Sequence, residues 1–140
     1  MHRSNMFLRA VLSWVCAGHI VEGLLVISGR RGIRLGSRLY GADFEPTDQF
    51  RYIIRAAGAY ILGMAFLQSL AIREPRRYSR VIDATIMVFA LRFFQRVVYR
   101  REVYRAYGIS PRQHWANTAF FNLPGALLLL ARLGMEDRGE

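Results

Sequence analysis

Four ionisable side chains lie inside long apolar runs of the sequence. His19 and Glu22 interrupt "CAGHIVEGLL", and Arg92 and Arg96 interrupt "FALRFFQRV". Residues three or four apart share one face of a helix, so each pair is expected to point in one direction. Ionisable groups within a membrane face the interior of the helix bundle and pair with one another. We therefore expect Glu22 to form an ion pair with Arg92 or Arg96.

Further polar residues accompany this pair. When Arg55 is added, one carboxylate faces up to three guanidinium groups. Such a positive excess attracts an anion or a strong acceptor, such as a lipid phosphate, a carboxylate or a quinone carbonyl. The alternative is purely structural: Arg55 and Arg96 extend to the surface, and the remaining pair only fixes the helix register. The candidate residues of this polar cluster or ligand site are His19, Glu22, Arg55, Arg92, Gln95, Arg96 and Asn122.

Motifs that carry catalysis are absent from the sequence. It contains no glycine-rich phosphate loop, CxxC pair, HExxH motif or nucleophile elbow. His2 and His114 lie outside the apolar runs, so a haem held by two histidines of this chain is not expected. We expect His19 to be a hydrogen-bonded packing residue. The sequence predicts no catalytic residue, no metal site and no cofactor, although a quinone is possible.

Four apolar segments must position these residues. They cover residues 6–28, 52–72, 81–99 and 116–134. Each is long enough to cross about 30 Å of hydrocarbon at about 1.5 Å per residue. Three of them lack the polar face that a soluble helix carries. The sequence therefore predicts an all-α, polytopic membrane protein in which residues 1–140 form one membrane domain, a bundle of four transmembrane helices.

The third segment is the least apolar, because it also contains Asp83 and Gln95. A central arginine costs about 2.5–3.5 kcal/mol on insertion, while each large apolar residue returns about 0.3–0.6 kcal/mol. Insertion of this segment is therefore expected to depend on neighbours that accept its charges. With consecutive segments antiparallel, most internal polar residues fall in the half of the bundle next to residues 29–51.

Residues 29–51 form a basic connection. In "GRRGIRLGSRLYG" the arginines recur at helical intervals, which predicts either a helix in the lipid headgroup region or an irregular basic loop. The residues expected to contact lipid headgroups are Arg30, Arg31, Arg34 and Arg38. The segment "FEPTDQF" predicts a helix start. After the third apolar segment, "YRREVYRAYG" predicts a helical continuation that stops at Gly108 and Pro111.

Charge and cysteine content limit the class of protein. The net charge is +10, and all 20 basic residues are arginines. They cluster between apolar runs rather than along one face, which favours loops at a lipid surface over nucleic-acid binding.

Cys16 is the only cysteine, so an internal disulfide is excluded. Trp14 and Val15 before it exclude a lipoprotein site. The first segment lacks a signal-peptide cleavage pattern. The arginines divide almost evenly between the two sides, so the orientation is not predicted.

Part of the chain resembles a known group of proteins. The Arg-then-Gly segment "RYIIRAAGAYILGMAF", the basic turn "REPRRYSR" and "FALRFFQRV" are similar to small bacterial four-helix membrane proteins of unknown function, distantly DoxX-like. The resemblance covers roughly residues 45–130. Such families often carry an acidic residue in the fourth helix, where this chain has "FNLPG". DoxX-like proteins include small subunits of quinone-linked oxidoreductases, so the resemblance implies a bacterial inner-membrane location and association with a quinone or a partner subunit.

Two functions are therefore expected. The first is a non-catalytic accessory or assembly subunit, which packs against other membrane subunits or against copies of itself. The second is a membrane protein that binds a quinone or an anionic lipid in a polar pocket in one half of the bundle. The small size and the lack of catalytic motifs favour the first, and the polar cluster favours the second.

Overall fold

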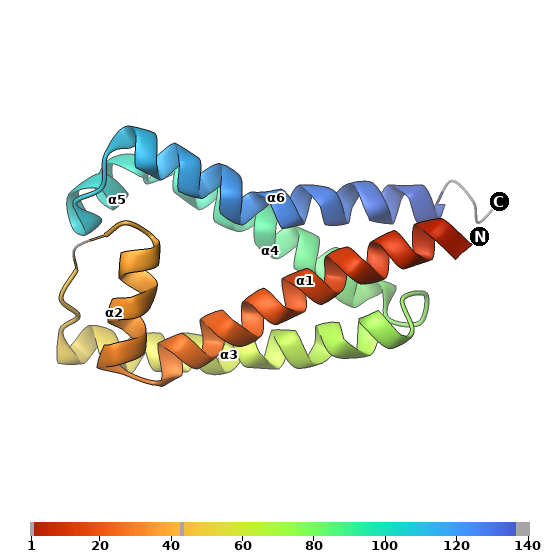
Figure 1. Ribbon diagram of the computed structural model, residues 1–140, viewed down its shortest axis with the longest axis horizontal. Coiled ribbons are helices and arrows are strands. Elements are labelled where there is room, and N and C mark those ends of the chain that lie inside the picture. Colours follow the sequence, from red (N-terminus) through yellow and green to blue (C-terminus); the bar gives the residue numbers. More distant parts are fainter. Residues whose placement is uncertain (1, 43, 137–140) are drawn as a thin grey trace.

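The computed structural model describes residues 2–42 and 44–136, and within these ranges all regular structure is helical (Figure 1). The six helices are α1 (His2–Ile27), α2 (Arg30–Leu39), α3 (Asp48–Arg73), α4 (Ser79–Val98), α5 (Arg100–Tyr107) and α6 (Pro111–Glu136). The long helices α1, α3, α4 and α6 cover the four predicted apolar segments except Ser28 and Tyr99 at two of their ends. The predicted all-α fold is confirmed.

Local sequence signals explain several helix ends. Thr47 caps α3, because its hydroxyl oxygen accepts a 3.2 Å hydrogen bond from the backbone N–H of Phe50. The predicted continuation after the third segment is present as α5, which a break at Tyr99 separates from α4. Helix α5 ends at Gly108, whose φ of 61° is left-handed and therefore favours glycine.

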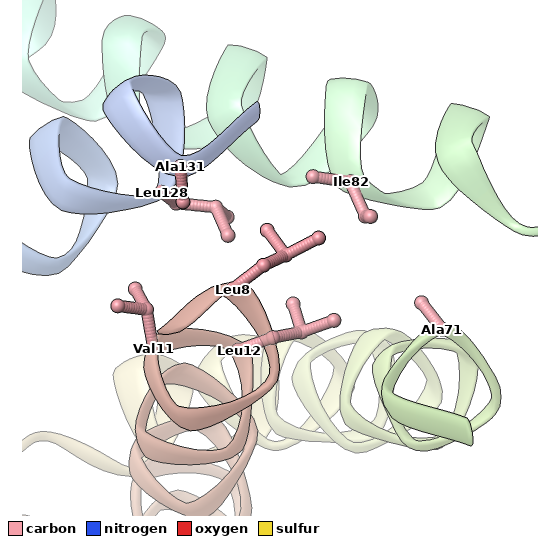
Figure 2. Close-up of a cluster of buried hydrophobic side chains, with 7 residues drawn as sticks. All are labelled: Leu8, Val11, Leu12, Ala71, Ile82, Leu128 and Ala131. Carbon is pink, nitrogen blue, oxygen red and sulfur yellow. The ribbon is translucent and has the colours of Figure 1, made fainter. Parts of the chain in front are cut away.

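The long helices form two pairs that meet at one end of the molecule. Helix α1 runs along α3, α4 contacts α6, and α1 also contacts α6. The pairs converge where both ends of the chain lie and diverge towards α2 and α5 (Figure 1). Figure 2 shows a core at the converging end to which all four long helices contribute. Its residues are Leu8, Val11, Leu12, Ala71, Ile82, Leu128 and Ala131.

Helices α1 and α3 approach each other closely through glycine. A Cβ atom at Gly23 would lie 3.2 Å from the carbonyl oxygen of Gly58, and a Cβ atom at Gly58 would lie 3.2 Å from that of Gly23. Of the small residues in this part of α3, Gly58 is the buried one, while Gly63 has open space beside it. The glycine pair therefore sets the spacing between these helices.

Among the residues that the structure describes, two helices, α1 and α3, are long and apolar enough to cross a membrane. Only 33% of the most apolar window of α1 and 17% of that of α3 are buried within the protein. Four such segments were predicted. Helix α4 falls short because it contains Asp83, Arg92 and Arg96, and the apolar stretch of α6 is diluted by polar residues such as Asn117 and Asn122.

Candidate functional site: a cavity between the diverging helices

A cavity of about 1160 Å³ lies between the diverging helix pairs, with α2 and α5 contributing to its wall. This volume is slightly larger than that of typical small-molecule sites, which measure about 300–1,000 Å³. Most of the wall is aliphatic or aromatic, including Trp14, Val21, Leu25, Phe89 and Phe120. A few polar side chains interrupt this surface, and five of them belong to the predicted cluster: His19, Glu22, Arg92, Gln95 and Arg96.

Glu22 and Arg92 form an ion pair in the cavity wall. Nη2 of Arg92 donates to Oε1 of Glu22 at 3.0 Å, and Nη1 donates to Oε2 at 3.3 Å. Both side chains are half-buried. Two parallel bonds between a guanidinium and a carboxylate fix the relative orientation of α1 and α4. The predicted pairing of Glu22 with Arg92 is thus present.

Arg96 lies one helical turn further along α4 and is held by aromatic rings. Its guanidinium carbon is 5.3 Å from the ring centres of both Tyr40 and Phe121. Its Nη1 donates to the Tyr40 hydroxyl at 3.2 Å. Within the described part of the chain Arg96 has no carboxylate partner. Asn117 of α6 in turn donates to the carbonyl of Tyr40 at 2.6 Å, which holds the end of α2 against α6.

His19 belongs to a chain of buried hydrogen bonds that links three helices. Its Nδ1 is 3.0 Å from Oε1 of Gln68, and Nε2 of Gln68 donates to the Thr85 hydroxyl at 3.2 Å. Thr85 donates to the Val81 carbonyl at 2.8 Å. The ring of His19 stacks on Phe89, with ring centres 6.0 Å apart. The prediction that His19 is a hydrogen-bonded packing residue is confirmed.

Three other predicted residues have different positions. Gln95 lines the cavity. Arg55 is exposed on α3, away from the cavity wall, and its guanidinium lies beside Gly29. Asn122 does not line the cavity either, since it donates to the Thr118 carbonyl of its own helix at 2.8 Å.

The predicted positive excess is wrong for this cavity. Arg55 is absent from its wall, and Glu102 of α5 contributes a second carboxylate. Two arginines and two glutamates therefore line the cavity. The depth of Arg55 along α3 could be predicted, but depth does not specify the helix face on which a side chain lies. Glu102 was not considered because it belongs to a connection outside the apolar segments.

Sequence reasoning also missed Tyr40, Gln68 and Phe121. Gln68 carried a usable signal, because it is a lone amide in the apolar run of α3 and is fully buried. A buried amide requires hydrogen-bond partners. Tyr40 and Phe121 carried no such signal, because the sequence does not show that an aromatic residue lies near an arginine in space.

Helix α2 is attached to the segment before α3 by one carboxylate. Nε of Arg30 donates to Oε1 of Glu45 at 2.9 Å, and Nε of Arg34 donates to Oε2 at 3.1 Å. Hydrogen bonds from Arg34 and Arg30 hold the pKa of Glu45 below its ordinary value. The helical alternative for this basic segment is confirmed. Arg31 and Arg38 are exposed and stay predicted headgroup contacts, whereas Arg30 and Arg34 are engaged internally.

We predict that Glu45→Gln loosens α2. A lowered pKa means that the carboxylate stabilises the fold above its ordinary pKa and loses this effect as the pH falls through the lowered value. Hydrogen exchange of α2 amides at pH 6 should be faster in Glu45→Gln than in the wild type, and the difference should shrink as the pH falls below the ordinary pKa of a glutamic acid. Glu74→Gln, which removes the partner of Arg77 in another turn, is the control. Equal exchange at pH 6 would contradict the prediction.

No protein-family model, curated protein or solved structure matches this chain. The resemblance to DoxX-like proteins therefore stays an expectation.

Proposed function

We propose that this chain is a four-helix transmembrane protein that binds a small amphiphile in the cavity between its diverging helices. In this proposal α1, α3, α4 and α6 cross the membrane. The short helices α2 and α5 lie at one membrane surface, opposite both ends of the chain (Figure 1).

The apolar surface of α4 and α6 supports four crossings rather than two. Large hydrophobic side chains are exposed along both helices: Met87, Leu91, Phe93, Phe94, Phe120, Leu123, Leu130 and Leu133. Soluble monomers rarely expose apolar surface over such an extent, whereas lipid tails would cover it.

Three charged residues of α4, Asp83, Arg92 and Arg96, are compatible with insertion because they have partners inside the bundle. Arg92 pairs with Glu22, and Arg96 packs on Tyr40 and Phe121. Asp83 accepts a 2.9 Å hydrogen bond from Nε of Arg132 of α6. Charged groups are tolerated in a membrane when they face the bundle and are paired. Helix α4 would thus insert together with α1 and α6, as expected for a segment near break-even alone.

The observation that carries the binding proposal is the composition of the cavity wall. A mainly aromatic and aliphatic surface with a few converging polar groups is typical of small-molecule sites. Trp14, Phe89 and Phe120 would contact an apolar ring or tail. The free N–H groups of Arg96 would bind an acceptor oxygen of the head group. Because the wall carries as many carboxylates as arginines, a neutral head of the quinone or hydroquinone class is favoured over an anionic lipid.

The binding proposal predicts a large effect at Arg96. In Arg96→Met the apolar stem is retained and the donors are lost, so binding of decylbenzoquinone to the purified protein should weaken about tenfold or more. Titration calorimetry in mild detergent measures this. Arg55→Met, which removes an arginine outside the cavity wall, should bind like the wild type. Equal affinities of the wild type and Arg96→Met would contradict the proposal.

A role as an accessory subunit is the second candidate function. The exposed aromatic residues Phe93 and Phe94 of α4 favour it, because aromatic side chains are enriched in protein interfaces. Purification from native membranes in mild detergent tests this role. Co-migration with other membrane subunits or as a homo-oligomer is expected for a subunit, and migration as a lone stable monomer counts against it.

A further inference from the structure

We infer that the bound amphiphile has a hydroxylated aromatic head, of the hydroquinone or phenol class, whose O–H donates to Nε2 of His19. The inference rests on the proposed function, since it names the ligand class of the same cavity. It follows from the direction of the hydrogen bonds that hold His19.

The buried chain beside the cavity has one consistent direction. The Thr85 hydroxyl gives its hydrogen to the carbonyl of Val81, so towards Gln68 it can only accept. The amide of Gln68 therefore directs its NH₂ group to Thr85 and its oxygen to His19. Because Oε1 of Gln68 can only accept, Nδ1 of His19 must carry a hydrogen.

This arrangement fixes the tautomer of His19. A neutral imidazole that carries its hydrogen on Nδ1 has a lone pair on Nε2, which is then an acceptor. The two ring nitrogens point in different directions, so Nε2 is directed away from Gln68. Buried partners of this kind commonly determine which nitrogen of a histidine is available for chemistry.

His19 lines the cavity, and we infer that Nε2, the ring nitrogen not bonded to Gln68, is the atom that reaches it. The residue is only 6% exposed and lines the cavity wall. No residue in the described part of the chain provides a hydrogen-bond partner for Nε2. Yet this atom is not sealed within the protein, in contrast to both ring nitrogens of His114. An acceptor beside a largely apolar cavity is best satisfied by a donor from the ligand.

Other residues of the cavity wall also fit a hydroxylated aromatic head. A hydroxylated ring could stack beside Phe89, which already packs on His19. Arg96 lies about two helical turns from Phe89 along α4, so its N–H groups could bind an acceptor oxygen at the other end of the head. A quinone or an ionised phosphate would offer only acceptors. Either would place an oxygen lone pair against that of Nε2, and both groups would stay unsatisfied.

Titration calorimetry of the detergent-purified protein tests the inference with three ligands that share one tail: decylhydroquinone, decylbenzoquinone and the dimethyl ether of the hydroquinone. The wild type should bind the hydroquinone about tenfold more tightly than either ligand without a hydroxyl. In His19→Phe, which keeps the aromatic ring, this preference should disappear. His114→Phe, which replaces a buried histidine outside the cavity wall, should retain it.

The possible outcomes separate the inference from the function on which it rests. Equal affinity of the wild type for all three ligands overturns the hydroxyl assignment and leaves amphiphile binding intact. A preference that survives in His19→Phe also overturns the assignment, because another group must then recognise the hydroxyl. If the wild type binds none of the three, both the proposed function and the inference fail. The primary comparison uses only the wild type, so it does not depend on how well a variant folds.

Discussion

Glu22→Leu is expected to lower the thermal stability of the protein markedly, by about 2 kcal/mol, between the values typical of exposed and buried ion pairs. The substitution leaves the guanidinium of Arg92 in the half-buried wall without its carboxylate. Arginine cannot lose its charge to adapt, so the uncompensated cation persists at any working pH. Thermal unfolding in detergent, followed by circular dichroism, measures the change.

Two further variants test whether Glu22 and Arg92 stabilise the protein as a coupled pair. In Arg92→Leu the carboxylate of Glu22 remains without its guanidinium partner, so stability should also fall. In the double variant Glu22→Leu with Arg92→Leu no charge is left, and most of the stability should return, because apolar replacements of buried pairs are often neutral. If the double variant loses the sum of the two single losses, the two side chains are not coupled and the pair is not a unit.

Gly125→Ala is expected to cost about 2 kcal/mol of stability and to disturb the cavity. A Cβ atom at this position of α6 would lie 2.5 Å from both Cβ and Cγ of Phe89 in α4. Cβ of Phe89 is fixed to its backbone, so rotation of the side chain cannot relieve the contact and the helices must separate. Because Phe89 stacks on His19, a shift of α4 also moves the polar wall. Ligand affinity should therefore fall together with the unfolding temperature.

Gly63→Ala is the matched control for this substitution. Gly63 lies inside α3, and a Cβ atom there would meet nothing within 4 Å. Alanine favours helix by about 1 kcal/mol over glycine, so this variant should be as stable as the wild type or slightly more stable. If Gly125→Ala is as well tolerated as Gly63→Ala, α4 and α6 do not pack as described here.

The helices and one contact could be predicted from the sequence, because both depend on local rules. Apolar length defined the four long helices, and Gly108 marked the end of α5. A pairing of Glu22 with Arg92 or Arg96 followed from depth, since an isolated carboxylate in an apolar run has few partners at its level, and the structure shows that Arg92 is the partner. Gln68 could have been included on the same ground.

The remaining features depend on how the helices rotate and diverge, which depth does not specify. Arg55 lies at a suitable depth but on an exposed face of α3. Glu102 and Tyr40 reach the cavity from short helices at the wide end of the bundle. The cavity itself arises because the shared apolar core occupies only the end near Leu8 and Leu128 (Figure 2). Packing between distant segments decides these features.

The four crossings are the central claim, and the side of the membrane on which α5 lies tests them most directly. With Cys16→Ala as background, Arg76→Cys, Gln49→Cys and Arg105→Cys each place one thiol at an exposed position between or beside the long helices. Sealed membrane vesicles are treated with a membrane-impermeant maleimide. Four crossings predict that residues 49 and 105 are labelled from the same side and residue 76 from the other. If residue 105 is labelled from the side of residue 76, only α1 and α3 cross, and the proposed site is not a cavity within a membrane bundle.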